Sequence, residues 1–342
     1  MAISDWGIGI VGLGGISLTH LEAYKRRGFN VIAGADPNDR NFETIRTRFG
    51  LTQLFEDAAN VMALDEVRIL DVTVPHQQSI RKPIVEAGAQ AGKALFIQKP
   101  LASSFREAKE LVEIAERRGV ALMVNQNSVF VPGFLAMEPY LRSHIGTPYY
   151  FQIENRAWVN PGPDVWYGKH KRWVGLDMAI HHFALADYWF GDWETVYAIG
   201  ASDPSQRGVC GDTVVVVNVG YAQGVQGVII NNWCYRGDLN RPHAREEVVI
   251  QGDKGTISGT SQSICVVVDD PVPSKIYPQF SGEWFPDAFG NSMMHFIEAL
   301  DSSKPFLCSG RHNLKAMALM EGVYRSLERK TVVTLKEIYA EG

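Results

Sequence analysis

The sequence lacks a marked excess of charge, a long apolar run and any closely paired cysteines. Its 342 residues carry 33 Lys and Arg against 38 Asp and Glu, a formal net charge of −5. Without a basic tail or block, binding to nucleic acid or to an anionic membrane surface has no electrostatic support. No apolar stretch approaches the roughly 20 residues that a membrane-spanning helix needs. These absences predict a protein that binds neither nucleic acid nor membranes.

Cysteine is scarce, and the N-terminus carries no leader pattern. The four cysteines are scattered without a CxxC pair, which favours a reducing compartment over a disulfide framework or a zinc site. The opening residues, MAISDWGIGIVG, enter a strand pattern directly and lack a charged segment followed by a cleavage site. We therefore expect a cytoplasmic protein without a metal centre.

The first part of the chain alternates short apolar runs with segments of helical periodicity. The apolar runs predict buried strands at 7–11, 31–35, 69–74, 94–97 and 120–124. Strand–helix alternation with short connections is typical of a parallel sheet covered on both faces. Residues 1–125 are therefore predicted to form an α/β Rossmann domain.

After about residue 126 the pattern changes to longer runs of Val, Ile and aromatic residues with fewer helices between them. Ala222-Gln223-Gly224, between two such runs, has the composition of a hairpin turn. One helix is expected over 174–190 and another over 312–327. Residues 126–342 are therefore predicted to form an α+β domain built on an open, largely antiparallel sheet.

A glycine-rich turn joins the first strand to the first helix. Gly12 would permit the tight turn, and Gly14, having no side chain, would let a diphosphate approach the backbone. Gly15 and Ile16 then open a helix whose N–H groups and dipole favour phosphate. Ser17 takes the third position of the fingerprint, where glycine or alanine is usual. The pattern alone is weak, but its place between a strand and a helix strengthens it.

Asp36 ends the second apolar run and is the residue expected to select the cofactor. Its carboxylate can accept hydrogen bonds from a pair of ribose hydroxyls and would repel a 2′-phosphate, which favours NAD over NADP. A turn aspartate before Pro37 is the alternative interpretation, and Arg40 lies close enough to complicate the choice. We expect NAD.

Further motifs resemble the glucose–fructose oxidoreductase/inositol dehydrogenase (Gfo/Idh/MocA) family. The resemblance covers nearly the whole chain and rests on the fingerprint, Thr73-Val74-Pro75, Gln98-Lys99-Pro100, Asn127, Asp177 with His181, and Gly252–Thr256. Such proteins pair a Rossmann domain with an open-faced sheet domain and typically oxidise a sugar or cyclic polyol with NAD(P). The resemblance implies an NAD-dependent oxidoreductase that acts on a secondary hydroxyl of a sugar, sugar acid or cyclic polyol. It also implies a homo-oligomer, a dimer or tetramer, formed through the C-terminal sheet.

The family also implies roles for individual residues. Its Glu-Lys-Pro segment closes the first domain at the substrate cleft, where the lysine contacts the reacting hydroxyl, and Lys99 matches that lysine. The resemblance further places Pro75, His76 and Gln98 among the cofactor contacts. Gln98 stands where glutamate is usual, and an uncharged amide there predicts that bound NAD is a stronger oxidant than in relatives with glutamate. Further departures from the family pattern leave the substrate open, at Ser79, Ala179 and Ala184.

The expected chemistry is loss of a proton to a base and of a hydride to the nicotinamide. On one helix, Asp177 and His181 would be spaced i,i+4 and project from the same face. His181 is assigned as general base, because an imidazole exchanges protons near neutral pH. Lys99 would stabilise the alkoxide-like oxygen, and Asp177 would orient Lys99 or hold a neighbouring hydroxyl. The sequence leaves open the alternative that Lys99 itself is the base.

A stretch rich in aromatic and basic side chains, 155–173, is expected to hold a polyhydroxylated ligand. Trp166 could stack on a sugar ring, and Arg156 and Arg172 could bind the carboxylate of a sugar acid. A solvated loop at an oligomer contact explains the same composition equally well. Asn127 could reach ligand hydroxyls or cap a turn. The predicted substrate contacts are Lys99, Asn127, Arg156, Trp166, Arg172, Asp177 and His181.

Two other functions stay open from the sequence alone. A redox-neutral enzyme could keep its NAD, oxidise a ring hydroxyl transiently and take the hydride back, in an isomerisation or elimination. A non-catalytic dinucleotide-binding ligand sensor would have no need of Lys99, Asp177 and His181 together. Their joint presence favours catalysis.

Overall fold

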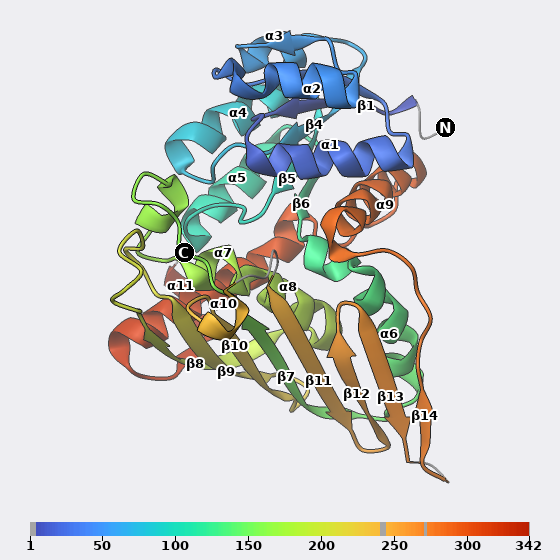
Figure 1. Ribbon diagram of the computed structural model, residues 1–342, viewed down its shortest axis with the longest axis vertical. Coiled ribbons are helices and arrows are strands. Elements are labelled where there is room, and N and C mark those ends of the chain that lie inside the picture. The colour runs from blue at the N-terminus through green and yellow to red at the C-terminus, as the bar shows by residue number, and fades with distance from the viewer. Residues whose placement is uncertain (1–4, 240–243, 270–271, 342) are drawn as a thin grey trace. The chain divides into compact units, whose positions relative to one another are not determined.

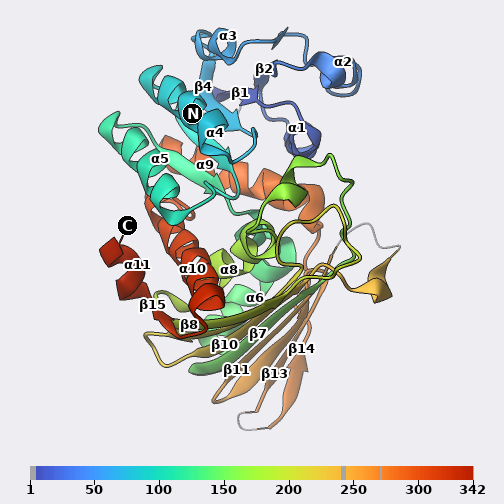
Figure 2. The same cartoon turned by 90° about the vertical axis from the view of Figure 1, so that its left-hand side faces the viewer.

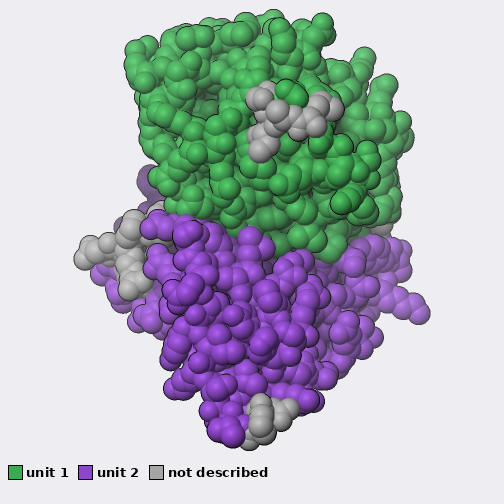
Figure 3. Space-filling model, turned by 90° about the vertical axis from the view of Figure 1, so that its right-hand side faces the viewer, with its two compact units in different colours: residues 1–130, 284–314 green, residues 131–283, 315–342 purple. Residues whose placement is uncertain are grey.

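The computed structural model describes residues 5–239, 244–269 and 272–341 (Figure 1). The chain divides into two units, which Figure 3 colours separately. Unit 1 comprises residues 1–130 and 284–314, and unit 2 comprises residues 131–283 and 315–342. Within the described ranges, no helix is both long enough and apolar enough to cross a membrane.

Unit 1 contains a six-stranded, wholly parallel sheet in the order β3-β2-β1-β4-β5-β6. Its strands are β1 (Gly7–Val11), β2 (Val31–Ala35), β3 (Leu54–Phe55), β4 (Val67–Val72), β5 (Ala94–Gln98) and β6 (Leu122–Asn125). The strand order reverses between β1 and β4, and ligands of such sheets bind at the carboxyl ends of the strands beside this reversal. The predicted Rossmann domain is confirmed.

The helices of unit 1 lie on the two faces of this sheet and bury its apolar strands. They are α1 (Gly15–Arg27), α2 (Phe42–Phe49), α3 (Ala58–Met62), α4 (Gln78–Gln90), α5 (Phe105–Arg117) and α9 (Phe289–Ser302). Short helical turns add η2 (Asp39–Asn41), η3 (Asn127–Phe130) and η6 (Trp284–Ala288). The sequence did not predict β3 and α3, because two and five residues are too few to show a period.

Each of the two compact units is built from two segments of the chain, so the units do not coincide with the predicted division between residues 125 and 126. The first crossing comes after Phe130, and the chain later returns to unit 1 over residues 284–314. In the returning segment, α9 packs on α1 and β6, and its Phe296 lies against Phe96 of β5 with ring centroids 5.9 Å apart. Figure 1 shows α9 beside α1 although the two are far apart in sequence.

Unit 2 contains a nine-stranded sheet in the order β14-β13-β12-β11-β7-β10-β9-β8-β15. Of the described strand pairs in this sheet, only β7–β10 is parallel, so the expectation of a largely antiparallel sheet is confirmed. Gly224, with φ +83°, turns β9 into β10 as the hairpin prediction required. The strands are β7 (Pro148–Arg156), β8 (Trp193–Ala201), β9 (Val214–Tyr221), β10 (Gln226–Asn232), β11 (Arg245–Gly252), β12 (Gly255–Thr260), β13 (Ser263–Val268), β14 (Ser274–Ile276) and β15 (Val333–Thr334).

One face of this sheet is covered by helices, and β7 shows the resulting alternation. Phe151, Ile153 and Asn155 are buried, whereas Gln152 and Glu154 between them are partly exposed. Helices α6 and α8 lie on the buried face (Figure 2). The helical elements of this unit are α6 (Pro132–Ser143), η4 (Trp166–Lys169), α7 (Val174–Asp177), α8 (Ala179–Phe190), η5 (Arg236–Asp238), α11 (Leu335–Glu341) and α10 (Gly310–Arg329), which runs across the unit boundary.

The predicted single helix over 174–190 is wrong in one respect that matters for the site. The backbone breaks at Met178 (φ −108°, ψ −50°), so Asp177 ends α7 and His181 lies in the first turn of α8. The N–H of His181 donates to the Met178 carbonyl at 3.0 Å, and the N–H of Asp177 donates to the Trp173 carbonyl at 2.7 Å. Asp177 and His181 therefore do not belong to one regular helix, and their projection from a common face stays a prediction.

Candidate functional site

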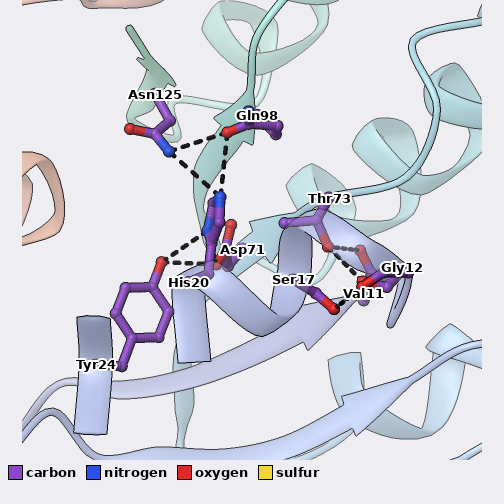
Figure 4. A network of polar contacts seen from close by, with 10 residues as sticks. Val11, Gly12, Ser17, His20, Tyr24, Asp71, Thr73, Gln98 and Asn125 are labelled. Atoms are coloured by element: carbon purple, nitrogen blue, oxygen red, sulfur yellow. Dashed lines mark hydrogen bonds and ion pairs between the residues drawn. The ribbon is translucent and has the colours of Figure 1, made fainter. Parts of the chain in front are cut away.

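The turn after β1 needs glycine at its first position for reasons internal to the chain. Gly12 has φ +93°, and a Cβ added there would lie 2.7 Å from the backbone nitrogen of Val74. The Thr73 side chain crosses the turn and donates to the Val11 carbonyl at 3.1 Å and to the Gly12 carbonyl (Figure 4). The first glycine is thus fixed by backbone geometry and close packing.

Gly14 and Gly15 differ, because nothing within the chain requires them to be glycine. Neither has a positive φ, and a Cβ added at either would meet no atom within 4 Å. No described side chain caps the N-terminus of α1, and its first turn holds no acidic residue. The Ser17 hydroxyl donates inward to the Gly14 carbonyl at 2.6 Å. An open, uncapped helix start with the space of two absent side chains fits a diphosphate.

Asp36 is held against this turn by backbone donors. Its Oδ2 accepts from the Leu13 N–H at 2.7 Å, and its Oδ1 accepts from the Asn38 N–H at 2.8 Å. A carboxylate oxygen has two lone pairs, so each oxygen keeps one for a ribose hydroxyl. Arg40 lies on the exposed stretch that follows. The geometry fits the predicted ribose-binding role of Asp36.

A buried arginine fixes the loops at the ends of β4 and β5, and it was not predicted from the sequence. Arg81, on α4, is 1% exposed. Its guanidinium donates to the carbonyls of Val74 at 2.6 Å, Gln98 at 2.9 Å and Leu101 at 3.0 Å, and also to that of Pro100. Burial lowers the pKa of Arg81 to about 9, which leaves the group charged at neutral pH.

Lys99 lies inside the segment that Arg81 holds. It is partly exposed, whereas Gln98 and Pro100 on either side are buried. The apolar strand β5 therefore ends with a lysine that is not enclosed in the core, on a turn anchored through its neighbours' carbonyls. This is the arrangement that the predicted role of Lys99 requires.

The side chain of Gln98 joins a buried polar network (Figure 4). Its Oε1 lies 2.9 Å from Asn125 Nδ2 and 3.1 Å from His20 Nε2. His20 Nδ1 lies 2.8 Å from Asp71 Oδ2, which also accepts from the Tyr24 hydroxyl at 2.6 Å. All five side chains are buried, and they connect α1 to β4, β5 and β6.

Burial, together with the adjacent Asp71, raises the pKa of Tyr24 well above its usual value, so the phenol remains a donor. His20, Tyr24 and Asp71 were not predicted from the sequence, although two signals could have indicated them. Asp71 interrupts the apolar run ILDV of a central strand, and His20 and Tyr24 stand i,i+4 on the inner face of the first helix. A charged residue within such a run needs a partner elsewhere in the fold.

In unit 2, Asp177 and His181 lie on either side of the helix break. His181 is 6% exposed and Asp177 is partly exposed. Burial, with the charge of Asp177 as a second cause, raises the pKa of Tyr167. Within the aromatic and basic stretch, Tyr167 therefore lies within electrostatic range of Asp177.

The two arginines predicted to bind a substrate carboxylate are already paired with acidic side chains. Arg172 forms a bidentate pair with Glu321 at 2.6 and 3.0 Å. Arg156 lies 3.2 Å from both Glu154 and Glu247. It alternates with the buried Asn155 and so lies on the sheet face opposite to the one that α8 covers. The structure does not group Arg156 with Asp177 and His181.

The remaining predicted substrate contacts have packing roles of their own. The Asn127 Oδ1 accepts from the Trp284 indole N–H at 2.8 Å, and the Asn127 side chain is buried. Trp166 is 40% exposed and meets Tyr167 and His170 edge-on. Lys99 belongs to unit 1 and the Asp177–His181 pair to unit 2, so the convergence of these three groups stays a prediction. In the described part of the chain, no three His, Cys, Asp or Glu side chains gather as a metal site.

Comparison with known proteins gives family matches over both parts of the chain. Residues 6–126 match the Gfo/Idh/MocA model described as oxidoreductase family, NAD-binding Rossmann fold, and residues 141–335 match its C-terminal alpha/beta domain. The chain is 27% identical to a D-apiose dehydrogenase of Paraburkholderia graminis, over 97% of this chain and 90% of that protein. It is 27% identical to a myo-inositol 2-dehydrogenase of Thermotoga maritima, over 97% and 99% of the two chains.

The fold also matches solved structures along nearly its whole length. An oxidoreductase from Agrobacterium radiobacter, determined in complex with NAD+, L-tartaric acid and magnesium, superposes with a TM-score of 0.86. The two chains are 22% identical, and the match covers 98% of this chain and 99% of that one. At this identity the likeness shows a shared fold.

Proposed function

Because the chain belongs to the Gfo/Idh/MocA oxidoreductase family, we propose that it transfers a hydride from a secondary hydroxyl of a sugar or cyclic polyol to NAD. The dehydrogenases that it resembles are named for D-apiose and myo-inositol, both polyhydroxylated. The observation that carries the proposal is the β5 turn, where Lys99 is partly exposed between buried neighbours that Arg81 anchors. This turn follows a carboxyl strand end near the sheet's reversal point, where such folds bind their ligands.

The cofactor contacts are assigned to unit 1. Gly14, Gly15 and the Ile16 N–H would receive the diphosphate, and the Asp36 carboxylate would receive the adenosine ribose hydroxyls. Gly12 shapes the turn. Towards the other end of the cofactor, the contacts are assigned to Pro75, His76, Gln98 and Lys99. When bound, NAD supplies the hydride acceptor.

The protein's own groups handle the proton and the developing charge. His181 accepts the hydroxyl proton on its imidazole, and the Lys99 ammonium stabilises the oxygen as the carbon loses its hydride. Asp177 orients Lys99 or holds a neighbouring hydroxyl. The alternative, with Lys99 as the base, gives the same overall reaction and is separated from it by the pH profile of the His181→Gln variant.

The charge pattern favours a neutral substrate over a sugar acid. Arg156 and Arg172 are each bound to carboxylates within unit 2, so binding an acid would first require breaking these pairs. Trp166, which is exposed, remains assigned to stacking on a sugar ring. Asn127 remains assigned to a ligand hydroxyl, although its oxygen already accepts from Trp284.

The direct test is a panel of sugars, lactones, aldonates and inositols, assayed for reduction of added NAD. We expect turnover with a neutral sugar or inositol, and loss of turnover with retained NAD affinity in Lys99→Ala. Asp36→Ala should lose NAD affinity instead. Conversion of a sugar without release of NADH would replace the proposal with the redox-neutral alternative. An absence of turnover across the panel, with NAD binding intact, would favour a ligand sensor.

We also propose that the protein self-associates, as a dimer or tetramer, through the open face of the unit 2 sheet. Ile199, Val216 and Ile230 are paired across β8, β9 and β10, and none of the three is fully buried. Among the described residues, no helix covers this face (Figure 2). Light scattering should give a mass above the monomer that falls in Ile199→Lys.

The prediction of a cytoplasmic location is supported by the four cysteines, which are thiols rather than disulfides.

A further inference from the structure

The ring of His20 lies between two oxygen atoms. Its Nδ1 is 2.8 Å from Asp71 Oδ2, and its Nε2 is 3.1 Å from Gln98 Oε1. The same Gln98 oxygen lies 2.9 Å from the Asn125 amide nitrogen. An ionised Asp71 can only accept, so with the Gln98 oxygen on the other side both ring nitrogens would have to donate, which is the imidazolium form.

The surroundings of His20 favour that charge. Asp71, on the central strand β4, is fully buried, and His20 is its ion-pair partner within the described ranges. A buried carboxylate is strongly unfavourable without a compensating cation. The other groups facing the ring are uncharged: the Tyr24 hydroxyl on α1, Gln98 on β5 and Asn125 on β6.

Aromatic rings enclose the rest of the imidazole. Tyr24, Phe96 and Phe289, from α1, β5 and α9, meet it edge-on, with centroids 5.9, 6.3 and 5.1 Å away. His20 itself has no exposed surface. The pair with Asp71 is therefore shielded from solvent, where an attraction between opposite charges is strongest.

A neutral His20 would demand the opposite amide orientation. With its proton on Nδ1 for Asp71, the ring would present a bare Nε2, and Gln98 would have to rotate its NH2 group towards it. Asn125 would then turn as well, to offer its Oδ1, an atom that has no partner among the described side chains in the present orientation. The protonation of His20 thus decides which end of the Gln98 amide faces away from the core.

We propose that His20, held as an imidazolium by Asp71, is a positioning residue that locks the Gln98 amide with its oxygen inward and leaves its NH2 group to donate to the bound cofactor. The proposal deepens the function proposed above and rests on it only in taking NAD as the ligand. A donor beside the nicotinamide does not favour the positively charged oxidised ring, whereas the carbonyl oxygen of the rotated amide would. In this chain, His20 and Asp71 therefore help to keep bound NAD a strong oxidant.

The first test is a nitrogen NMR spectrum of histidine-labelled protein without substrate. The chain has nine histidines, and the His20 signals are assigned by their loss in His20→Gln. We expect both His20 nitrogens to show the doubly protonated signature at neutral pH in wild type. Should a variant not fold, through-bond correlations assign the wild-type ring. A singly protonated His20 in the wild-type protein would overturn the proposal.

The second test measures the dissociation constants of NAD+ and NADH for wild type and Asp71→Asn. This substitution leaves the net charge of the pair at zero, because His20 loses its extra proton along with the carboxylate. A change in the ratio of the two dissociation constants would therefore reflect the orientation of the Gln98 amide and not a changed charge. In Asp71→Asn we expect the affinity for NAD+ to increase about three- to tenfold relative to the affinity for NADH, the range for exchanging one hydrogen bond.

Tyr24→Phe is the matched control for Asp71→Asn. It removes a hydrogen bond to Asp71 but keeps the pair with His20, so the ratio of the two dissociation constants should stay as in wild type. An unchanged ratio in Asp71→Asn would overturn the proposal even if His20 is doubly protonated. Neither measurement needs turnover. An absence of turnover across the sugar panel would therefore refute the proposed reaction without deciding whether His20 positions the Gln98 amide.

Discussion

Alanine at Gly14 should stabilise the cofactor-free protein and weaken NAD binding at the same time. Gly14 has φ −77° and ψ −167°, a conformation open to any residue, and an added Cβ meets nothing within 4 Å. Replacing such a glycine stabilises a protein by ~0.4–1 kcal/mol, because the unfolded chain loses freedom. A methyl group in the space proposed for the diphosphate should cost ~1–3 kcal/mol of binding, about 5- to 150-fold in Kd.

Gly12→Ala is the matched comparison, and its effect on stability should have the opposite sign. Gly12 has φ +93°, and an added Cβ would lie 2.7 Å from the Val74 nitrogen. A left-handed conformation alone costs a non-glycine residue ~1–2 kcal/mol, and the close contact adds to this. Urea unfolding of the NAD-free proteins measures both changes, and NADH fluorescence titration measures binding. Unchanged NAD affinity in Gly14→Ala, or a loss of its stability, would refute the proposal that Gly14 leaves space for the diphosphate and is not required by the fold.

Three further predictions concern single residues. Arg81→Lys should lower kcat more than NAD affinity and cost ~1–3 kcal/mol of stability, because one ammonium cannot span four carbonyls. Partial rescue of the Arg81→Gly variant by added guanidinium would support this prediction. Equal losses in kcat and NAD affinity would contradict it. Gln98→Glu should lower the redox potential of bound NAD, and an unchanged or higher potential would discard the idea. Burial lowers the pKa of His295, whose Nε2 accepts from the Leu307 N–H at 2.9 Å. Because the pKa is lowered, the stabilisation of the folded protein by neutral His295 is complete above the ordinary histidine pKa, ~6.5. It is lost as the pH falls through the lowered value. Urea unfolding should show that loss in wild type and not in His295→Gln, and equal acid sensitivity of the two proteins would refute it.

Features encoded over short stretches of chain were predictable from the sequence. The apolar runs that became β1, β2, β4, β5 and β6 were recognisable because buried parallel strands are apolar on both faces. The Gly12–Ile16 turn was recognisable because its residues are neighbours in the chain. Even here the sequence could not show that Gly12 serves the turn while Gly14 leaves open space, since the atoms around them come from elsewhere.

The candidate site was predicted only in part, for the same reason. Lys99 and Asp36 were found because each ends an apolar run, so its place in the sheet follows from local pattern. Glu154 is two residues from Arg156, but the other partners of Arg156 and Arg172 were not found, because Glu247 and Glu321 lie far along the chain. A surplus of basic residues in a sequence does not reveal which of them are already paired.

The sequence by itself determined the alternation of strands and helices, the glycine turn and the lysine at the end of β5, because backbone geometry and burial period act over a few residues. Only the tertiary structure decided that residues 284–314 return to unit 1, that the helix breaks at Met178, and that His20 meets Asp71. These outcomes depend on contacts between residues distant in the chain. Their energies come from packing and from pairing buried charges, which no local pattern records.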